Sequence, residues 1–504
     1  MSDSSNNASA RTVAVVGAGP VGCLAAMALA KRGWRVDLYE GRADLRLPES
    51  RENAALRSIN LAMSHRGIIA LQAVNPAAAD RFLADAIPMH GRMIHTPKGE
   101  ERTVYYDRDH QHINSIDRAV LNQGLLDEVE ALPGVKLYFR HKVQNIDFDG
   151  KRMTVQDLES GQDREVHFDF CIGADGSYSV VRRQMMRFVR MDFEQKYMKD
   201  EYMELRMPPG KDAEGQPTFL LHPNRLHIWP RHSFMLIALP NKDKTFTCTL
   251  FAPSTEFDKL DTADKFLSWF EHQFPDAYRH IGADALAKDY GRNPRCPLIC
   301  TTSNPYYYKD RAIILGDAAH AMVPFYGQGL NCGLEDVRVL GTILEAHGIT
   351  SETASEDPSA VDPRLARALA EYSATRHEDL VAICDLAQRN YVEMRHSVTT
   401  PMFLFAKAVD NALYALSRRQ RPSLAAFRTT LASVPFPAGD PAEWIPLYTM
   451  VTFRPDVSYA TAQRKAERQA RVLTALGWAT ASVVGAGALL AAFAGYQRAQ
   501  RLLR

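Results

Sequence analysis

The chain has 504 residues, of which 46% are hydrophobic and 24% are charged. A chain of this length can bury more than one hydrophobic core, so we expect at least two domains. The formal net charge is only +1 and the basic residues are dispersed, which excludes a polycationic surface for nucleic acid. The seven cysteines show neither a zinc-ligand spacing nor a disulfide framework, so a reducing compartment is expected.

The chain opens with the pattern of a βαβ unit. Residues 12–16 form a short apolar run that is typical of a buried parallel strand. A helical stretch follows over residues 20–32, and a second strand is expected over residues 35–39. A glycine-rich turn joins the first strand to the helix. This arrangement predicts a dinucleotide-binding site.

Three glycines in this turn satisfy the GxGxxG pattern, and each has a mechanical reason. Gly17 allows a tight turn, Gly19 lets a pyrophosphate approach the backbone, and Gly22 lets the helix pack close to the strand. The free N–H groups of the helix N-terminus then face the phosphates. Glu40 ends the second strand, where it can accept hydrogen bonds from a ribose. Taken alone, Glu40 could be an ordinary surface acid, and the motif does not choose between FAD and NAD.

The middle of the chain favours a second structural layer. Between residues 202 and 251, runs of β-branched and aromatic residues are broken by Pro and Asn, which indicates an antiparallel sheet. We expect this sheet to cover a substrate site. Residues 312–315 form another buried strand that leads into a Gly-rich turn, and beyond residue 333 the pattern is largely helical.

The C-terminal segment predicts a transmembrane helix. No charged residue occurs over residues 472–497, and the stretch 477–496 would span about 30 Å as a helix, which matches the core of a bilayer. Basic residues flank the segment, and Trp478 and Tyr496 stand near its ends as interfacial aromatic residues would. We therefore expect a tail anchor. The alternative is a buried helix, because Ala and Gly make the segment only weakly hydrophobic.

Two later segments resemble FAD fingerprints of the class A flavoprotein monooxygenases. Residues 170–183 read FCIGADGSYSVVRR, and residues 312–333 read AIILGDAAHAMVPFYGQGLNCG. Asp317 could accept a ribitol hydroxyl, and the loop over 327–331 would direct backbone N–H groups at the pyrimidine edge of a flavin. Each segment by itself could be a mere tight turn. Their order after the GxGxxG motif implies FAD as the cofactor.

Further stretches resemble one family in this class, the kynurenine 3-monooxygenases. They are RSINLAMS at 57–64, GRMIH at 91–95, SIDRAVLN at 115–122, LHIWPR at 226–231, NYVEMR at 390–395 and WIPLYTMVTF at 444–453. The resemblance covers residues 11–460. It implies that NADPH reduces the flavin, that O2 adds to it, and that a flavin C4a-hydroperoxide hydroxylates L-kynurenine to 3-hydroxy-L-kynurenine, a step of tryptophan degradation and NAD biosynthesis.

The resemblance also implies a set of substrate-binding residues. In the family an Arg and a Tyr hold the substrate carboxylate, and an Asn and a second Tyr assist them. A guanidinium offers the bidentate fork that a carboxylate accepts, and phenols and an amide add neutral donors. A surface arginine and core tyrosines are the structural alternative. The matching residues are Arg92, Tyr106, Asn390 and Tyr448, with Phe325 and Tyr326 as an aromatic wall over the flavin.

A second set of matching residues would surround FAD. Because the cofactor carries the chemistry, no protein nucleophile and no metal is expected. His320 could be read as an acid or base, but we expect it to pack or hydrogen-bond near the flavin. The sequence has no second GxGxxG motif, so NADPH is expected to bind transiently. Besides Gly17, Gly19 and Gly22, the FAD residues implied are Val21, Tyr39, Glu40, Gly41, Arg42, Ala62, Arg118, Val143, Val180, Asp317, Leu330 and Asn331.

The predicted fold class is α/β: a Rossmann-like FAD-binding domain, an interleaved antiparallel-sheet substrate domain, a C-terminal helical region and a transmembrane helix. The resemblance implies a location on the mitochondrial outer membrane, with the catalytic part facing the cytosol. A class A hydroxylase of another aromatic acid and a membrane-tethered FAD-binding protein without turnover remain as alternatives. The expected boundaries are 11–200 and 301–380 for the FAD-binding domain, 201–300 for the substrate domain, 381–471 for the helical region and 472–497 for the anchor.

Overall fold

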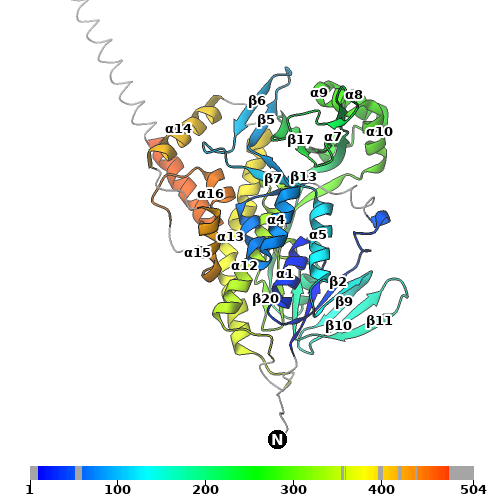
Figure 1. Cartoon of the computed structure of the whole chain (residues 1–504), viewed down its shortest axis with the longest axis vertical. Helices are drawn as coiled ribbons and strands as arrows, with labels where there is room; N and C mark the ends of the chain where they lie inside the picture. The colour runs from blue at the N-terminus through cyan, green and yellow to red at the C-terminus, as the bar shows by residue number, and fades with distance from the viewer. Residues whose placement is uncertain are drawn as a thin grey trace, which may run out of the picture.

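A parallel sheet and a larger antiparallel sheet form the two main layers of the molecule (Figure 1). The long helix α13 (Pro363–Arg395) runs alongside both of them. The computed structural model describes residues 10–50, 60–352, 357, 359–395, 401–417, 423–436 and 440–475, with the backbone alone at 401–404.

The parallel sheet brings the three glycine-rich segments to one edge. In spatial order its strands are β20 (Tyr307–Tyr308), β21 (Ala312–Ile314), β12 (Phe170–Gly173), β1 (Thr12–Val16), β2 (Arg35–Glu40) and β8 (Val135–Phe139). All neighbours pair in parallel except β20 with β21. The segments that carry the predicted fingerprints follow β1, β12 and β21. Because the carboxyl ends of parallel strands lie at the same edge, these segments meet there.

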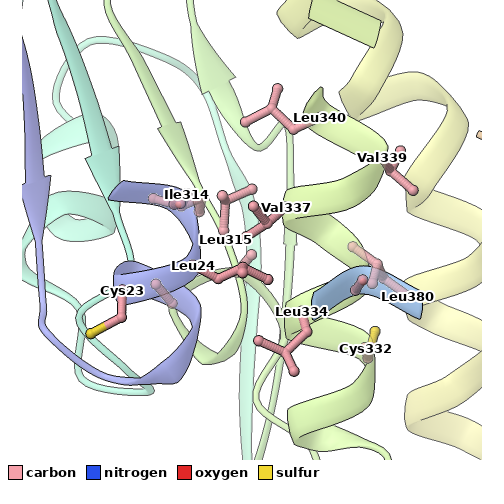
Figure 2. Packing of buried hydrophobic residues seen from close by; sticks show 14 of the residues in the cluster. Cys23, Leu24, Ile314, Leu315, Cys332, Leu334, Val337, Val339, Leu340 and Leu380 are labelled. Atoms are coloured by element: carbon pink, nitrogen blue, oxygen red, sulfur yellow. The ribbon is translucent and has the colours of Figure 1, made fainter. Parts of the chain in front are cut away.

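Helices cover this sheet and form the larger hydrophobic core. α1 begins with Pro20, whose missing N–H costs no intrahelical bond at the first position. Figure 2 shows Leu24 of α1 and Leu334 and Val337 of α12 meeting in one apolar layer beside Leu315. The helices of this domain are α1 (Pro20–Ala30), α3 (His65–Val74), α4 (Pro76–Asp85), α5 (Arg118–Glu130), α6 (Val180–Met185), α11 (Asp317–His320), the 3-10 helix η1 (Pro324–Tyr326) and α12 (Gly329–Ala346).

Two small antiparallel sheets flank the FAD-binding domain. One contains β3 (Leu61–Met63), β7 (Ile113–Ile116) and β4 (Ile87–Met89). The other contains β9 (His141–Asp147), β10 (Arg152–Asp157) and β11 (Asp163–His167), and it extends away from β2 in Figure 1.

The seven-stranded sheet forms the second layer and has a core of its own. Its strands are antiparallel except where β16 pairs with β5 in parallel. Three helices, α8 (Ala263–Gln273), α9 (Pro275–Ile281) and α10 (Ala283–Arg292), bury one face of the sheet around Trp229 and Phe270. In spatial order the strands are β19 (Cys296–Asn304), β13 (Asp192–Met207), β18 (Phe246–Pro253), β17 (Phe234–Pro240), β16 (Leu226–Arg231), β5 (Gly91–His95) and β6 (Glu101–Tyr105).

Shorter elements complete this layer and the C-terminal part. β14 (Gly210–Lys211) pairs with β15 (Pro217–Thr218), and α7 (Ser254–Phe257) follows β18. The C-terminal helices lie on one side of the molecule in Figure 1. They are α14 (Pro401–Ser417), α15 (Leu424–Ser433), α16 (Leu447–Phe453) and a helical stretch over 459–475.

The predicted transmembrane helix requires a correction of the fold class. Across the residues that the structure describes, none of the helices has the length and apolar character needed to cross a bilayer. Residues 472–475 end a helix whose preceding turns carry charged side chains, and residues 476–497 of the predicted segment lie outside the described residues. The fold observed is therefore an FAD-binding α/β fold without the membrane span that was predicted.

Candidate active site

The glycine-rich turn after β1 has little space at two of its three glycines. Gly17 has a φ of +101°, and a Cβ on it would lie 2.5 Å from the Ala174 carbonyl oxygen. A Cβ on Gly22 would lie 1.9 Å from the Gly17 carbonyl oxygen, which no side chain tolerates. A Cβ on Gly19 would meet nothing within 4 Å. The open space at the start of α1 therefore lies beside Gly19, where a pyrophosphate would bind.

These two environments predict opposite effects of the same substitution. Gly22→Ala should destabilise the fold by about 1–3 kcal/mol, because the backbone must move apart. Gly19→Ala should change the free energy of unfolding by less than about 0.5 kcal/mol, since the residue has an ordinary φ of −73°. It should nevertheless weaken FAD binding by about tenfold or more, because its methyl group enters the pyrophosphate space. Urea unfolding and flavin titration of the two apoproteins check this, and equal stabilities would contradict it.

The end of β2 holds the turn in place. One Glu40 oxygen accepts a hydrogen bond from Ala18 N at 3.0 Å, and the other accepts from Arg42 N at 3.0 Å. The Tyr39 ring stacks on Tyr138 with a centroid distance of 4.9 Å. Glu40 therefore already stabilises the glycine-rich turn, and an additional role toward a ribose stays a prediction.

Other residues predicted around FAD lie next to these segments. A Cβ on Gly41 would be 3.9 Å from Lys142 Cβ, so β9 borders the end of β2, with the Val143 side chain buried. Val180 begins α6 and donates its backbone N–H to Asp175 Oδ2 at 2.6 Å. Arg118 is exposed at the first position of α5.

The turn after β21 presents one exposed carboxylate. Asp317 is exposed, although residues 311–316 and 318–321 on both sides of it are buried. Gly316 adopts a φ of +58° there, and its Cβ position would be 3.0 Å from Val21 Cγ2. Val21 thus packs the first glycine-rich segment against the third and leaves the Asp317 side chain directed outward, available for a ribitol hydroxyl.

Asn331 fixes the loop that precedes α12. Its side-chain oxygen accepts from Ser64 N at 2.8 Å, and its amide donates to Ala62 O at 2.8 Å and to Gly327 O at 2.7 Å. Asn331 therefore ties β3 to the loop over 327–331, with Leu330 half-buried at the start of α12. The free N–H groups of this helix N-terminus make it suited to hold negative charge.

The predicted carboxylate clamp is gathered from four separate elements. Arg92 lies on β5, Tyr106 directly follows β6, Tyr326 ends η1, and Tyr448 lies on α16. The Tyr448 ring stacks on Tyr106 at a centroid distance of 5.0 Å and on Tyr326 at 5.7 Å. The Arg92 guanidinium carbon is 5.4 Å from the Tyr448 ring centroid. The structure brings these four side chains together around one buried cation.

Two polar atoms of this cluster are available to a ligand. Arg92 Nε and the Tyr106 hydroxyl are buried, and neither finds a hydrogen-bond partner in the described part of the chain. Buried polar groups are normally paired, because an unpaired one costs about 1–3 kcal/mol. A carboxylate could accept from both donors, so the chemistry of the cluster fits an acidic ligand.

Asn390 stands behind the aromatic wall. Its amide nitrogen donates to Phe325 O at 2.6 Å, and the neighbouring Tyr391 ring stacks on the Phe325 ring with centroids 3.9 Å apart. Phe251 of the antiparallel sheet lies 4.9 Å from the same ring. Asn390 thus positions Phe325, and a direct contact of its amide with a substrate stays a prediction.

Two charged residues beside Arg92 were missed by the sequence analysis. Glu393 Oε1 accepts from Arg92 Nη1 at 3.2 Å, and the Lys407 ammonium donates to Tyr105 O at 2.6 Å. Glu393 could have been found, because it lies three residues after Asn390 on the same helix face. Burial lowers the pKa of Lys407 to about 8, and nearby Arg92 adds to this effect. Lys407 comes from α14, and nothing in the sequence places that helix near residue 92.

A buried ion network lies between the two parts of the site. Glu335 accepts from Arg66 at 2.9 Å and from Arg376 at 3.0 Å. Asp336 accepts from Arg376 at 2.8 Å and from His320 Nε2 at 2.5 Å. All five side chains are buried. His320 therefore packs within a structural network, as expected, and is not directed at a substrate.

The network joins the flavin side of the site to the substrate side. Asp336 Oδ2 also accepts from Gly316 N at 3.0 Å, which fixes the turn before Asp317. At the other end, Arg66 donates to backbone carbonyls in and after the helix that carries Tyr448. The acceptors are Met450, Val451, Arg454 and Val457.

The pKa of Asp336 predicts how this network depends on pH. Burial raises the pKa of the carboxyl, but His320 and Arg376 outweigh burial and lower it to about 2. An unfolded aspartate has a pKa of about 3.9, so the charge stabilises the fold above that pH and its contribution is lost as the pH falls toward 2. The difference in free energy of unfolding between wild type and Asp336→Asn should be constant from about pH 7 to pH 5 and shrink below about pH 4. Urea unfolding across this range measures it, and a difference that does not change with pH would contradict it.

Known proteins resemble the chain over nearly its whole length. A family model described as FAD binding domain matches residues 10–358. The kynurenine 3-monooxygenase of Yarrowia lipolytica is 43% identical over 486 residues, and the match covers 95% of this chain and 96% of that protein. The kynurenine 3-monooxygenase of Cryptococcus neoformans is 45% identical over 499 residues, with 95% and 96% covered. The chain belongs to the kynurenine 3-monooxygenase family.

Solved structures outside the kynurenine 3-monooxygenase family share the fold. A 2-methyl-3-hydroxypyridine-5-carboxylic acid oxygenase superposes with a TM-score of 0.60 at 20% identity, over 81% of this chain and 97% of that one. The chain is therefore an FAD-dependent monooxygenase with the α/β fold of aromatic hydroxylases. Its residues fit that cofactor: open space beside Gly19, the exposed Asp317 and the N-terminus of α12 lie along one edge of the parallel sheet.

Proposed function

We propose that this chain hydroxylates L-kynurenine to 3-hydroxy-L-kynurenine with NADPH and O2. The observation that carries the proposal is the buried Arg92, whose Nε and the Tyr106 hydroxyl beside it lack partners among the described residues. Curated family members that are 43% and 45% identical carry the name of this activity. Together they support an amino acid substrate bound through its carboxylate.

The pairing of Arg92 with Glu393 supports a zwitterionic substrate over a simple aromatic acid. A guanidinium and a carboxylate 3.2 Å apart can exchange partners with an α-carboxylate and an α-ammonium group. Arg92 would bind the carboxylate, with the Tyr106 and Tyr448 hydroxyls as additional donors. Glu393 would accept from the ammonium group. A benzoate has no group for Glu393 and would leave that carboxylate facing its ring.

The remaining residues orient the substrate ring and exclude water. Phe325 and Tyr326 are both buried and border the loop at the start of α12. Bound FAD, once reduced by NADPH, supplies the activated oxygen for hydroxylation. The protein holds the ring in place with aromatic surfaces and keeps donors of the α12 N-terminus toward the negative charge.

The proposal is tested by NADPH oxidation of the purified FAD-loaded enzyme. L-kynurenine should accelerate NADPH consumption and yield a product one oxygen heavier, detected by mass spectrometry. The matched analogue that lacks the α-amino group should accelerate it far less, because Glu393 then has no partner. If the analogue or a benzoate couples as well as L-kynurenine, the enzyme is a hydroxylase of another aromatic acid and the substrate assignment is wrong.

We also infer a location at the cytosolic face of the mitochondrial outer membrane. The family resemblance alone supports this inference, which includes no statement about the means of attachment. Fractionation of cells that express the tagged full chain tests it. Recovery of the protein apart from mitochondria would overturn it.

A further inference from the structure

A cavity of about 460 Å3 lies between β13, β19 and α13. Exposed residues of β13, such as Lys196, form part of its wall, so the cavity opens to solvent. Its lining residues differ from those of the FAD and substrate sites. They include Lys196, Cys300, His377, Cys384, Asp385 and Gln388.

Two thiols face each other in this cavity. Cys300 of β19 and Cys384 of α13 are hydrogen-bonded to one another, and Gln388 Nε2 donates to Cys300 Sγ at 3.5 Å. The bond from Cys384 lowers the pKa of Cys300 to about 7, although burial opposes this effect. Near neutral pH a large share of Cys300 is therefore thiolate, which is the reactive form of a cysteine.

The other buried cysteines differ from this pair. Burial raises the pKa of Cys23, Cys171 and Cys248 far above the usual value. Those thiols are protonated at neutral pH and serve as small apolar groups in the core. The chain thus contains one solvent-connected thiol pair with nucleophilic character and several inert thiols that serve as internal standards.

We propose that Cys300 and Cys384 form a peroxide-reactive dithiol that is oxidised to a disulfide between β19 and α13. Hydrogen peroxide is the oxidant. The proposal concerns only these thiols and their cavity, so it does not depend on which aromatic substrate the enzyme hydroxylates.

The chemistry balances in two steps. The Cys300 thiolate attacks one oxygen of hydrogen peroxide, the O–O bond breaks, and the departing hydroxide takes a proton to become water. Cys300 is then a sulfenic acid. The Cys384 sulfur attacks the Cys300 sulfur, the S–O bond breaks, and the second hydroxide takes the Cys384 proton. Two thiols lose two electrons in total, and one peroxide becomes two waters.

A disulfide here would act on elements that support the flavin turn and the aromatic wall. Next to Cys300, Thr301 N donates to Ala321 O at 2.7 Å, and Ser303 Oγ donates to Ala319 O at 2.7 Å. On α13, Asn390 holds Phe325. A disulfide requires sulfurs about 2.0 Å apart, closer than two hydrogen-bonded thiols, so its formation draws the strand and the helix together.

The test treats the FAD-loaded protein with hydrogen peroxide, alkylates remaining thiols with iodoacetamide and identifies peptides by mass spectrometry without reduction. We expect a linked pair of peptides containing Cys300 and Cys384, lighter than their sum by two hydrogens and separated again by dithiothreitol. Its formation should be about tenfold or more faster than oxidation of Cys171 or Cys248. In Cys384→Ser, a 1,3-dione probe should label Cys300 as a sulfenic acid.

The matched control is Cys296→Ser, because Cys296 lies on the same strand outside the cavity lining. This variant should form the linked pair at the wild-type rate. The proposal is overturned if both thiols remain open to alkylation after peroxide treatment of the wild type. It is also overturned if Cys300 links to another cysteine.

Discussion

Arg92→Met is expected to lower kcat/KM for L-kynurenine by about 100- to 1,000-fold, which corresponds to about 3–4 kcal/mol. Arg92 is the cation around which Tyr106 and Tyr448 gather, and its Nε is an unused buried donor. A methionine fills similar volume but leaves the substrate carboxylate in a buried site without its counter-charge. Steady-state kinetics with detection of the hydroxylated product measures the effect.

The size of this effect should depend on the fork geometry as well as on the charge. Arg92→Lys keeps the charge but cannot make two parallel hydrogen bonds, so an intermediate loss is expected. Arg102→Met on the adjacent strand β6 is the control, because that side chain is exposed. Wild-type kcat/KM in Arg92→Met would exclude the carboxylate clamp. A loss confined to kcat with unchanged KM would place Arg92 in the chemistry rather than in binding.

Glu335→Ala is expected to destabilise the protein by about 3–5 kcal/mol. Glu335 neutralises Arg66 and Arg376, which are fully buried, and Arg338 lies 3.8 Å from it. Without this carboxylate, three buried guanidinium groups share too little negative charge. Removing one member of a buried ion network leaves the others uncompensated, and this cost exceeds the loss of the pair itself. Chemical unfolding of the FAD-loaded protein measures the change.

A matched control lies on the same helix. Glu345 is also on α12, but its side chain is 74% exposed and its nearest cation, Arg32, is 3.9 Å away. Glu345→Ala should change the free energy of unfolding by less than about 0.5 kcal/mol. Equal stabilities of the two variants would show that the buried network contributes little. Because Arg66 holds the carbonyls around α16, Glu335→Ala should also weaken L-kynurenine binding more than Glu345→Ala does.

Local patterns were sufficient for the elements of the FAD-binding domain. The glycine spacing after β1 predicted a strand, a turn and a helix, and α1 begins at Pro20 as expected. The strand before Asp317 was also visible, because a short apolar run followed by a Gly-Asp turn has few other solutions. The transmembrane helix was the prediction that failed, since no helix in the described part of the chain meets the requirement of length and apolarity.

The clamp shows where reasoning from the sequence alone ends. Arg92, Tyr106, Tyr326 and Tyr448 are distant in sequence, and only a family resemblance connected them before their geometry was known. Their stacking, and the partner that Glu393 provides for Arg92, depend on contacts across β5, η1, α13 and α16. Periodicity reports which face of an element is buried, but it does not report which elements touch.

The sequence by itself determined that this protein binds FAD, because the glycines of the first turn and the Gly-Asp turn act through backbone geometry within a few residues. It also determined the family, through long specific stretches. Only the tertiary structure decided that Asp336 and Glu335 join the flavin turn to the substrate helix, and that Cys300 meets Cys384. Those contacts join residues that are far apart in the chain, and their free energy arises only when packing removes the groups from water.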